Sequence, residues 1–566
     1  MEAEIVPAEV LVPPEAYGRG FRHDDAALVI DGYLRRLAAQ DARCRAVLGH
    51  LARAFLRGRG QQVLGFARLG DYARERMGLS ARELQGLATV TARLEALLAI
   101  RTAFDAGEIC WAQVRLLVGI ATPESERAWL ELARGRTVRA LAAVIRAAGR
   151  SEVHEEEDGD DEPRGRFRLR CPRRVARLWQ QTVELARRMA GAELTQGQAA
   201  EVIAAEGLSA RPPSAEVWPE PPPRPNGPPD PEETPAAFAA DLDWKAVREA
   251  IPADVEALAI GCEELDPFAL DARLRQVVRA RQRIAWQTGR LLRVFLDRRL
   301  YRLMGFSSGG RYLTERLGSS ARKARALVAL ERKTWQAPEL GHAYREGQLS
   351  AVRALTLLPV VTEDTAAVWV SRAQEVTVRR LTDEVEWALA GRDGLAPVLP
   401  PPSGAALGEW QTCARPEWEL ADSQITFTAP ASVVALFRTA VLAFTDRPDW
   451  YWIGCERLLR HVRDEWRTQP RHRDPIFERD GWRCAVPACS SRRNLHDHHV
   501  LFRSRGGDNT RDNRVTVCAG HHLHGIHAGH VRAWGTAPDG ITWELGVRAG
   551  REPLLRLAGD RYVAGS

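Results

Sequence analysis

A long internal repeat is the feature of this sequence that most limits how the chain can fold. The segment GFARLGDYARERMGLSAR at 65–82 returns as GFSSGGRYLTERLGSSAR at 305–322, and the match continues without a gap over more than a hundred residues. A period of this length indicates a duplicated domain rather than a solenoid of helix pairs. The matched residues include Asp31, Leu34, Arg35, Gly49, Trp129 and Leu141, which recur as Asp271, Leu274, Arg275, Gly289, Trp369 and Leu381.

Each copy has the hydrophobic pattern of helices. Apolar residues from Ile30 to Phe55 recur at spacings of three, four or seven, and the second copy repeats this pattern from Leu270 to Phe295. The alternating segments 166–172 and 424–430 each end at a proline, which predicts a short strand followed by a helix. We therefore expect a mainly α fold with two tandem helical repeat domains.

Composition marks the expected domain boundaries. The acidic run 152–163 predicts a solvated loop, the eleven prolines of 211–235 predict a linker, and 396–404 is a further break. The length of 566 residues predicts three or four domains. The expected order is an N-terminal tail (1–24), helical repeat 1 (25–205), a Pro-rich linker (206–240), helical repeat 2 (241–465), a small α+β domain (470–550) and a C-terminal tail (551–566).

The same composition excludes some classes of protein. No run of eighteen apolar residues is present, which argues against a membrane-spanning helix and a membrane partner. The first residues lack the basic and apolar regions of a signal peptide, so we expect a cytoplasmic protein. The net charge of +6 is small for this length and does not describe a polycation.

A helix pair recurs in both copies. A first helix is expected to end at Gly78 or Gly318, and Ser80 or Ser320 is placed to cap the next helix. A plain helical hairpin is the preferred interpretation, and a DNA-reading helix-turn-helix stays open as the alternative. The alternative depends on four basic residues near the second helix, Arg82, Arg322, Lys323 and Arg325.

Histidine and cysteine gather near the C-terminus. Nine of the fourteen His lie between 472 and 530, and residues 471–535 hold eleven Arg against six Asp and Glu. Such a local positive charge is expected of a segment that contacts phosphates. The four residues Cys484, Cys489, Cys518 and His521 form two closely spaced pairs, which is the pattern of a closed tetrahedral zinc site.

A second set of polar residues is interleaved with these pairs: His498, His499, Asn513 and His522. The local pattern predicts a strand, a loop, a second strand and a helix around them. Such histidines can hold a divalent metal at a phosphodiester, while a neutral His activates water. The Gly506-Gly507 pair would let the loop turn, Asn513 would fasten it, and Arg503 and Arg505 are placed to contact the DNA backbone.

With this motif, residues 474–530 resemble an HNH endonuclease domain of the ββα-metal superfamily. The resemblance implies cleavage of DNA to 3'-hydroxyl and 5'-phosphate ends. It makes His498 and His522 metal ligands, His499 the general base and Asn513 the middle Asn of the motif. It also assigns a structural zinc to the Cys/His pairs, with His521 in place of a fourth Cys. Many members have a further His four residues after the metal His, where this chain has Ile526, so His527 is the candidate third ligand.

The implied cofactors are a structural Zn²⁺ and a catalytic Mg²⁺ or Mn²⁺, with Zn²⁺ or Ni²⁺ as alternatives. The repeated part resembles helical regions that precede HNH domains in many bacterial proteins, and a homodimer formed through these repeats stays open. The leading hypothesis is a metal-dependent DNA endonuclease. The alternatives are a nucleic-acid-binding zinc protein with an inactive nuclease fold and a delivered DNase toxin, and cleavage of RNA is also left open.

Overall fold

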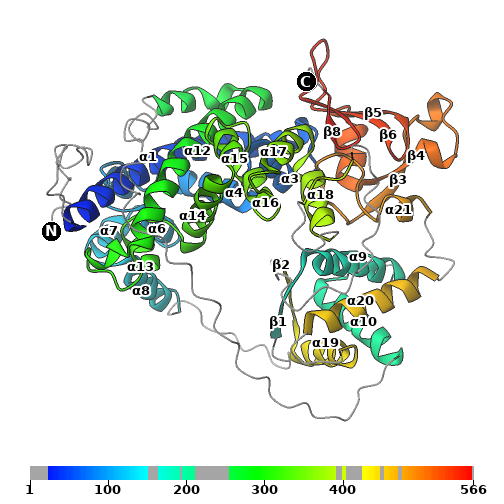
Figure 1. Ribbon diagram of the computed structural model, residues 1–566, viewed down its shortest axis with the longest axis horizontal. Coiled ribbons are helices and arrows are strands. Elements are labelled where there is room, and N and C mark those ends of the chain that lie inside the picture. The colour runs from blue at the N-terminus through cyan, green and yellow to red at the C-terminus, as the bar shows by residue number, and fades with distance from the viewer. Residues whose placement is uncertain are drawn as a thin grey trace.

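The structure is a computed structural model in which three bodies can be distinguished (Figure 1). The chain is mainly helical, with small antiparallel sheets. We call residues 23–150 and 254–390 the helical scaffold, 164–210 and 423–468 the ribbon body, and 475–563 the C-terminal module. The structure describes residues 23–150, 164–190, 194–210, 254–390, 398–402, 423–445, 451–468 and 475–563. The acidic run 152–163, the Pro-rich segment 211–235, four of the nine residues of 396–404 and nearly all of the expected N-terminal tail lie outside these residues.

The helices of the scaffold begin at matching positions in its two halves. Helices α4 to α8 begin at 81, 98, 111, 126 and 138, and α14 to α18 begin 240 residues later in each case. The first half contains α1 (His23–Arg57), α2 (Gly60–Val63), α3 (Leu69–Tyr72), η3 (Ala73–Met77), α4 (Ala81–Leu94), α5 (Leu98–Asp105), α6 (Trp111–Leu117), α7 (Glu126–Arg134) and α8 (Val138–Arg150). The second contains η4 (Val255–Ala259), η5 (Cys262–Glu264), α12 (Pro267–Asp297), η6 (Leu300–Arg302), α13 (Gly309–Glu315), α14 (Ala321–Gln336), α15 (Pro338–Arg345), α16 (Ala351–Leu357), α17 (Ala366–Glu375) and α18 (Val378–Ala390).

The caps expected from the sequence are present in both halves. Gly78 and Gly318 have φ of 65° and 60°, which is the left-handed conformation that ends a helix. The hydroxyl of Ser80 accepts a hydrogen bond from the Glu83 amide at 3.1 Å, and that of Ser320 from the Lys323 amide at 3.2 Å. These hydrogen bonds satisfy amides at the start of α4 and α14 that have no partner within the helix.

The basic residues of the helix pair do not share one exposed face. Arg82, Arg322 and Arg325 are exposed. Lys323, in contrast, has its ammonium 3.6 Å from the carboxylate of Asp41 on α1. Of the four basic residues on which the DNA-reading alternative depends, Lys323 therefore forms an ion pair at the contact between the two halves of the scaffold.

Helices α1 and α12 pack against each other, and the two halves exchange contacts around them. The Tyr72 hydroxyl donates to Asp271 at 3.0 Å, and the Tyr312 hydroxyl donates to Asp31 at 2.9 Å. Arg76 pairs with Asp271 at 2.7 Å in the same way that Arg316 pairs with Asp31 at 3.0 Å. Burial raises the pKa of both tyrosines well above the usual value, so each hydroxyl keeps the proton that it donates.

The exchange continues at the helix ends. The Glu75 carboxylate accepts from the Val378 amide at the start of α18, and Glu315 accepts from the Val138 amide at the start of α8. A Cβ on Gly78 would lie 2.8 Å from Ser350, and one on Gly318 would lie 3.1 Å from Cys110, the residue 240 positions before Ser350. Each half of the scaffold therefore completes the other in a reciprocal way, as in an isologous dimer interface.

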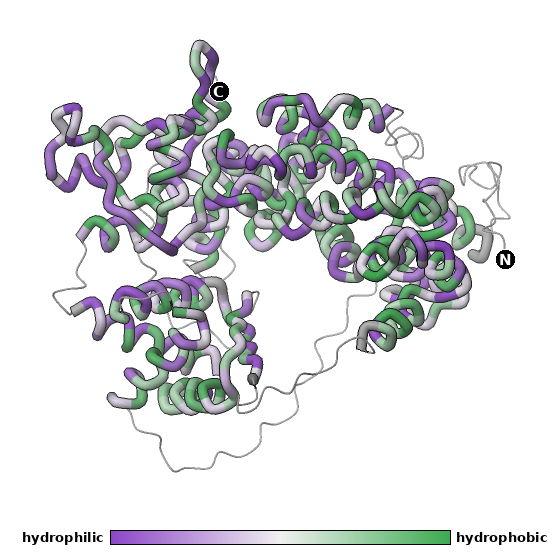
Figure 2. The backbone as a smooth tube through the Cα atoms, turned by 180° about the vertical axis from the view of Figure 1, so that it is seen from behind, coloured by the Kyte–Doolittle hydropathy of each residue, from purple (hydrophilic) through white to green (hydrophobic). Residues whose placement is uncertain are grey.

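The ribbon body is also built from two parts of the chain that are far apart in the sequence. Both predicted strand-then-helix units are confirmed, but the two strands pair with each other in one antiparallel ribbon, so residues 164–205 do not complete a compact first repeat as expected. The buried rings of Phe167 and Phe427 stack across the ribbon at 4.9 Å, and Trp179 and Phe437 pack on them. Figure 2 shows α19, at the bottom of this body, as hydrophobic along most of its length. The elements are β1 (Arg164–Cys171), α9 (Arg173–Ala190), α10 (Gln196–Ala210), β2 (Ser423–Pro430), α19 (Ala431–Ala443) and α20 (Tyr451–Thr468).

The C-terminal module contains a two-stranded hairpin whose first strand carries His498 and His499, a π-helix that carries His521 and His522, and a four-stranded antiparallel sheet. The segment 551–566, which we expected to form a tail, instead contributes two of the four strands of this sheet, β7 (Leu555–Ala558) and β8 (Arg561–Tyr562). The reason is that Leu555 and Leu557 are buried as β7 pairs with β6. The elements are α21 (Pro475–Arg479), β3 (Leu495–His499), η9 (Arg503–Arg505), η10 (Arg511–Asn513), β4 (Arg514–Cys518), η11 (Gly520–Ile526), β5 (Val531–Thr536), β6 (Gly540–Leu545), β7 (Leu555–Ala558) and β8 (Arg561–Tyr562).

The three bodies meet at one carboxylate. Asp383 on α18 of the scaffold accepts from Arg177 of the ribbon body at 2.5 Å and from Arg483 of the C-terminal module at 2.8 Å. Although burial raises the pKa of Asp383, the two guanidinium groups hold it below its usual value. Among the described helices, none combines the length and the apolar character needed to cross a membrane.

The exchanged tyrosines give a test of the reciprocal contact. We expect Tyr72→Phe and Tyr312→Phe to lower the free energy of unfolding by about 2 kcal/mol each, because each removes a buried hydrogen bond to a carboxylate. Tyr301→Phe is the control, since its hydroxyl makes no hydrogen bond within the described residues, and it should cost less than about 0.5 kcal/mol. Urea unfolding measures all three changes. Markedly unequal losses for Tyr72 and Tyr312 would contradict the equivalence of the two contacts.

Candidate metal centres

The C-terminal module brings Cys484, Cys489, Cys518 and His521 together. All four are buried, and one ligand atom from each lies within 4.8 Å of the others. The first two come from the loop before β3, Cys518 ends β4, and His521 lies in the π-helix η11. His521 Nδ1 is 3.4 Å from the Cys484 sulfur and 3.5 Å from the Cys518 sulfur. A group of three thiols and one imidazole, closed on all sides, could hold a metal ion.

The outer nitrogen of His521 faces the scaffold. Its Nε2 lies 3.1 Å from the carbonyl oxygen of Gly65 and 3.2 Å from the Ala67 amide. With a metal on Nδ1, Nε2 carries the hydrogen and donates it to Gly65, which is the usual support for a metal-bound histidine. Without a metal, burial lowers the pKa of His521, but the sulfur of Cys484 outweighs this effect and the pKa rises to about 10. A bound cation would displace the proton from Nδ1.

The cysteine loop is held by Arg379 of α18. Its guanidinium donates to the carbonyl oxygens of Cys484 and Cys489, each at 2.9 Å, and it forms an ion pair with Asp560. Asp71 of the scaffold also accepts from the amide and the hydroxyl of Ser490, at 3.2 and 2.6 Å. The four-residue cluster is therefore braced by both halves of the scaffold. The sequence pattern identified the cluster but gave no signal for these distant partners.

A second group of possible ligands lies nearby. His498 on β3, His522 on η11 and His527 directly after η11 offer nitrogen atoms that lie within 4.8 Å of one another. His522 Nε2 is 3.2 Å from His527 Nε2. The sequence left the third ligand uncertain because His527 follows His522 by five residues instead of four. The His527 amide donates to the His522 carbonyl at 3.1 Å, and this π-helical bond is how residues five apart come to one face.

The environment keeps His498 uncharged at neutral pH. Burial lowers the pKa of His498 to about 4, and the neighbouring His522 and His527 contribute to the shift. The pKa of His522 is lowered by burial and by His496 and His527. A neutral imidazole has a free lone pair, so these rings are in the form that binds a metal ion.

His496 was not identified from the sequence. Its Nδ1 lies 2.8 Å from His522 Nδ1, on the side of the ring away from His527. A strand places residues two apart on one face, so the spacing of His496 and His498 was a signal for this contact. The hydrogen bond fixes which nitrogen of His522 is free to face the group of three histidines.

His499, the predicted general base, contacts a residue that the sequence analysis also missed. His499 Nε2 lies 2.8 Å from Asn509 Oδ1, so the ring donates a hydrogen through Nε2 and keeps the lone pair on Nδ1. The loop carrying Asn509 is fastened by Asn513, as expected. The Asn513 side chain accepts from the Leu501 amide at 2.7 Å and donates to the carbonyl oxygens of Leu501 and Asp508 at 3.1 and 2.8 Å.

The loop between β3 and β4 also holds the two predicted DNA-contacting arginines. Arg503 and Arg505 lie on the short helix η9 and are exposed. The Gly506-Gly507 pair is required for this turn, since Gly506 has φ of 88° and a Cβ on Gly507 would lie 1.8 Å from the Leu501 carbonyl oxygen. Two positive charges are thus presented at the loop that leaves His499.

Comparisons of the chain with protein-family models, with curated proteins and with solved structures found no match. Any function inferred for this site therefore has to be argued from the residues described above.

We expect one zinc ion per chain that survives dialysis against a mild chelator, because three thiolates and an imidazole form a closed site for Zn²⁺. Cys484→Ser should release this ion and expose the C-terminal module to proteolysis, while the scaffold stays folded. Cys262→Ser, which changes a cysteine outside the cluster, is the control and should retain the ion. Elemental analysis of the purified proteins decides the outcome, and wild-type protein without zinc would rule the assignment out.

Proposed function

We propose that this protein is a metal-dependent endonuclease that hydrolyses DNA phosphodiester bonds in its C-terminal module. The observation that carries the proposal is the convergence of His498, His522 and His527 beside the loop that holds His499. A cluster of imidazoles that can hold a metal ion, a base and exposed arginines is the set of groups that hydrolysis of a phosphodiester needs. The resemblance of residues 474–530 to HNH endonucleases agrees with this assignment.

Three imidazoles suit Zn²⁺ or Ni²⁺, whereas Mg²⁺ and Mn²⁺ prefer oxygen ligands and would need water and phosphate oxygens to complete their shell. His498 and His522 would hold the ion, with His527 as the third ligand. When bound, the ion would stabilise the charge that develops on the leaving oxygen.

The residues of the chain supply the remaining steps. His499 accepts the proton of the attacking water on Nδ1, because Asn509 holds the hydrogen on Nε2. The water oxygen bonds to phosphorus and the bond from phosphorus to the 3'-oxygen breaks. The 3'-oxygen leaves as an alkoxide and takes a proton from solvent water, which gives a 3'-hydroxyl and a 5'-phosphate. Asn513 keeps the loop in place, and Arg503 and Arg505 bind the phosphates on either side. His496 positions His522 through its Nδ1 hydrogen bond.

We further infer that the helical scaffold consists of two copies of one domain that pair within a single chain. Matching helix starts and exchanged hydrogen bonds support this inference. The contact that would otherwise join two protomers is then internal, which leaves no need for a homodimer through this surface. The zinc proposed for the four-residue cluster would join the loop before β3 to β4 and η11 within the C-terminal module, while the outer nitrogen of His521 contacts Gly65 of the scaffold.

His499→Ala should lower the rate of plasmid cleavage by at least about a hundredfold, because loss of a general base typically costs that much. Folding and DNA binding should be unchanged. His524→Ala is a matched control. His524 is an exposed histidine on η11 that belongs to neither group of candidate ligands, so this variant should cleave at the wild-type rate. Near-normal cleavage by His499→Ala in metal-replete buffer would contradict the base assignment. An inactive wild-type protein that still binds DNA would favour the inactive nuclease fold.

His498→Ala and His522→Ala should respond differently from His499→Ala. Each removes a ligand of the catalytic ion, so a higher concentration of metal should restore part of the activity. Titration of cleavage with Mn²⁺, Mg²⁺, Zn²⁺ and Ni²⁺ gives the half-saturating concentration for each variant. An unchanged metal dependence would show that these histidines are not ligands.

A further inference from the structure

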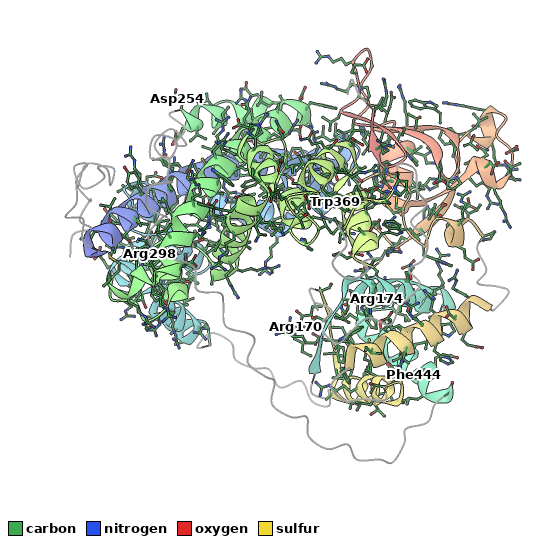
Figure 3. All side chains as sticks on the ribbon, in the orientation of Figure 1. Arg170, Arg174, Asp254, Arg298, Trp369 and Phe444 are labelled. Carbon is green, nitrogen blue, oxygen red and sulfur yellow. The ribbon has the colours of Figure 1, made fainter. Side chains whose placement is uncertain are left out.

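The two-stranded ribbon β1–β2 has one buried face and one polar face. Along β1, Phe167 and Leu169 are buried while Arg166, Arg168 and Arg170 are exposed. Along β2, Ile425 and Phe427 are buried while Thr426 is half-buried and Gln424 and Thr428 are exposed. The alternation follows from the period of two of a strand, so the polar side chains share the face opposite the helices. In Figure 3, Arg170 lies on the edge of this body that is turned away from its helices.

The register pairs the two polar rows directly. Arg166 is opposite Thr428, Arg168 opposite Thr426, and Arg170 opposite Gln424. Within the part of the chain that the structure describes, none of these six side chains has a hydrogen bond or an ion pair, whereas Arg174 and Arg177 at the start of α9 are paired with Glu456 and Asp383. Three unpaired guanidinium groups in one row, with no carboxylate among the facing residues, form a site for an anionic partner.

The buried face makes this ribbon rigid. Four aromatic rings pack beneath it with centroid distances from 4.9 to 5.5 Å, and helices from both halves of the body cover them. The backbone positions of the polar residues are therefore fixed before any partner arrives, so binding orders their exposed side chains but needs little ordering of the backbone. A row of polar residues at fixed spacing can match a regular row of chemical groups.

We infer that the exposed face of β1–β2 binds in the major groove of double-stranded DNA and reads base sequence. The major groove of B-form DNA admits a two-stranded ribbon, and ribbon proteins use the side chains of that face to contact bases. Arginine pairs with guanine through two hydrogen bonds, glutamine with adenine, and threonine contacts either a polar group or the methyl group of thymine. The deep, narrow major groove of double-stranded RNA would not accept the ribbon.

The ribbon body also contacts the C-terminal module. Gln181 of α9 donates to the Gly481 carbonyl oxygen at 3.4 Å, and the guanidinium of Arg188 lies 4.4 Å from the ring centre of Phe477. DNA held by the ribbon would therefore be held by a body in direct contact with the candidate nuclease. The binding inference does not depend on cleavage, since it concerns different residues and can be measured in a protein that does not cut.

The test measures binding by the full chain carrying His499→Ala, with a pool of DNA duplexes of randomised sequence. We expect the bound duplexes to share a preferred sequence. Replacing Arg166, Arg168 and Arg170 together by Ala should abolish that preference and weaken binding to the preferred duplex by about tenfold or more. Arg168→Lys keeps the charge but loses the two-pronged hydrogen bond, so it should relax the preference at one position with a smaller loss of affinity.

The matched control replaces the exposed arginines Arg82, Arg322 and Arg325 of the scaffold by Ala, and it should leave the preferred sequence unchanged. An unchanged preference in the ribbon variant would overturn the inference. So would a uniform loss of affinity for all sequences, which would indicate contacts with phosphates alone. Competition by duplex RNA at equal concentration would also overturn it. Loss of binding in the control but not in the ribbon variant would instead place DNA on the helix pairs. Failure of the wild-type protein to cleave DNA, while the ribbon still determines the preferred sequence, would contradict only the proposed nuclease.

Discussion

The contact between α1 and α12 is the interaction on which the rest of the structure depends. At its centre Arg281 forms ion pairs with Asp41 at 2.8 Å and with Glu83 at 3.2 Å, and Asp41 also faces Arg45 and Lys323. Burial alone would raise the pKa of Asp41, but the surrounding cations hold it well below its usual value. A buried cluster of charged side chains is costly to remove from water, and removing one member leaves the others as buried charges without a partner. It therefore specifies one alignment of the two long helices, and this alignment brings each tyrosine within reach of the aspartate of the other half.

The C-terminal module breaks this reciprocity. It binds the scaffold through Asp71 on α3 and through Arg379 on α18. The positions 240 residues away hold Arg311 and Arg139, so the charge is reversed at one of the two equivalent surfaces. A carboxylate accepts from the amide and hydroxyl of Ser490, whereas a guanidinium at Arg311 could not accept a hydrogen bond there. The scaffold thus presents two related surfaces, of which only one has the hydrogen-bonding groups that this module needs.

Local features of the fold were predictable from the sequence, and distant ones were not. The caps at Ser80 and Ser320, the strands before α9 and α19, and the two groups of candidate ligands all follow from residues close together in the chain. The exchange of Tyr72 and Tyr312, the pairing of β1 with β2 and the support of His521 by Gly65 join residues that are more than 150 positions apart. Hydrophobic periodicity identifies a buried face but not the surface that covers it. The third histidine, His527, was uncertain for a different reason. An α-helix places residues four apart on one face, whereas His522 and His527 are five apart and share a face only because the turn is π-helical.

Asp383 links these parts physically. Its carboxylate, on the scaffold, binds one arginine of the ribbon body and one of the C-terminal module, and the buried Arg379 one turn away holds the cysteine loop. Neutralising this carboxylate would leave Arg177 with only Glu386 and would remove the anion that Arg483 binds, which would weaken the contact between the two smaller bodies. If the ribbon selects a DNA sequence and the histidine cluster cuts the strand, the distance between the selected site and the cut is set at this junction. Sequence choice and chemistry are then carried by separate bodies, and a single carboxylate helps to fix how they are combined.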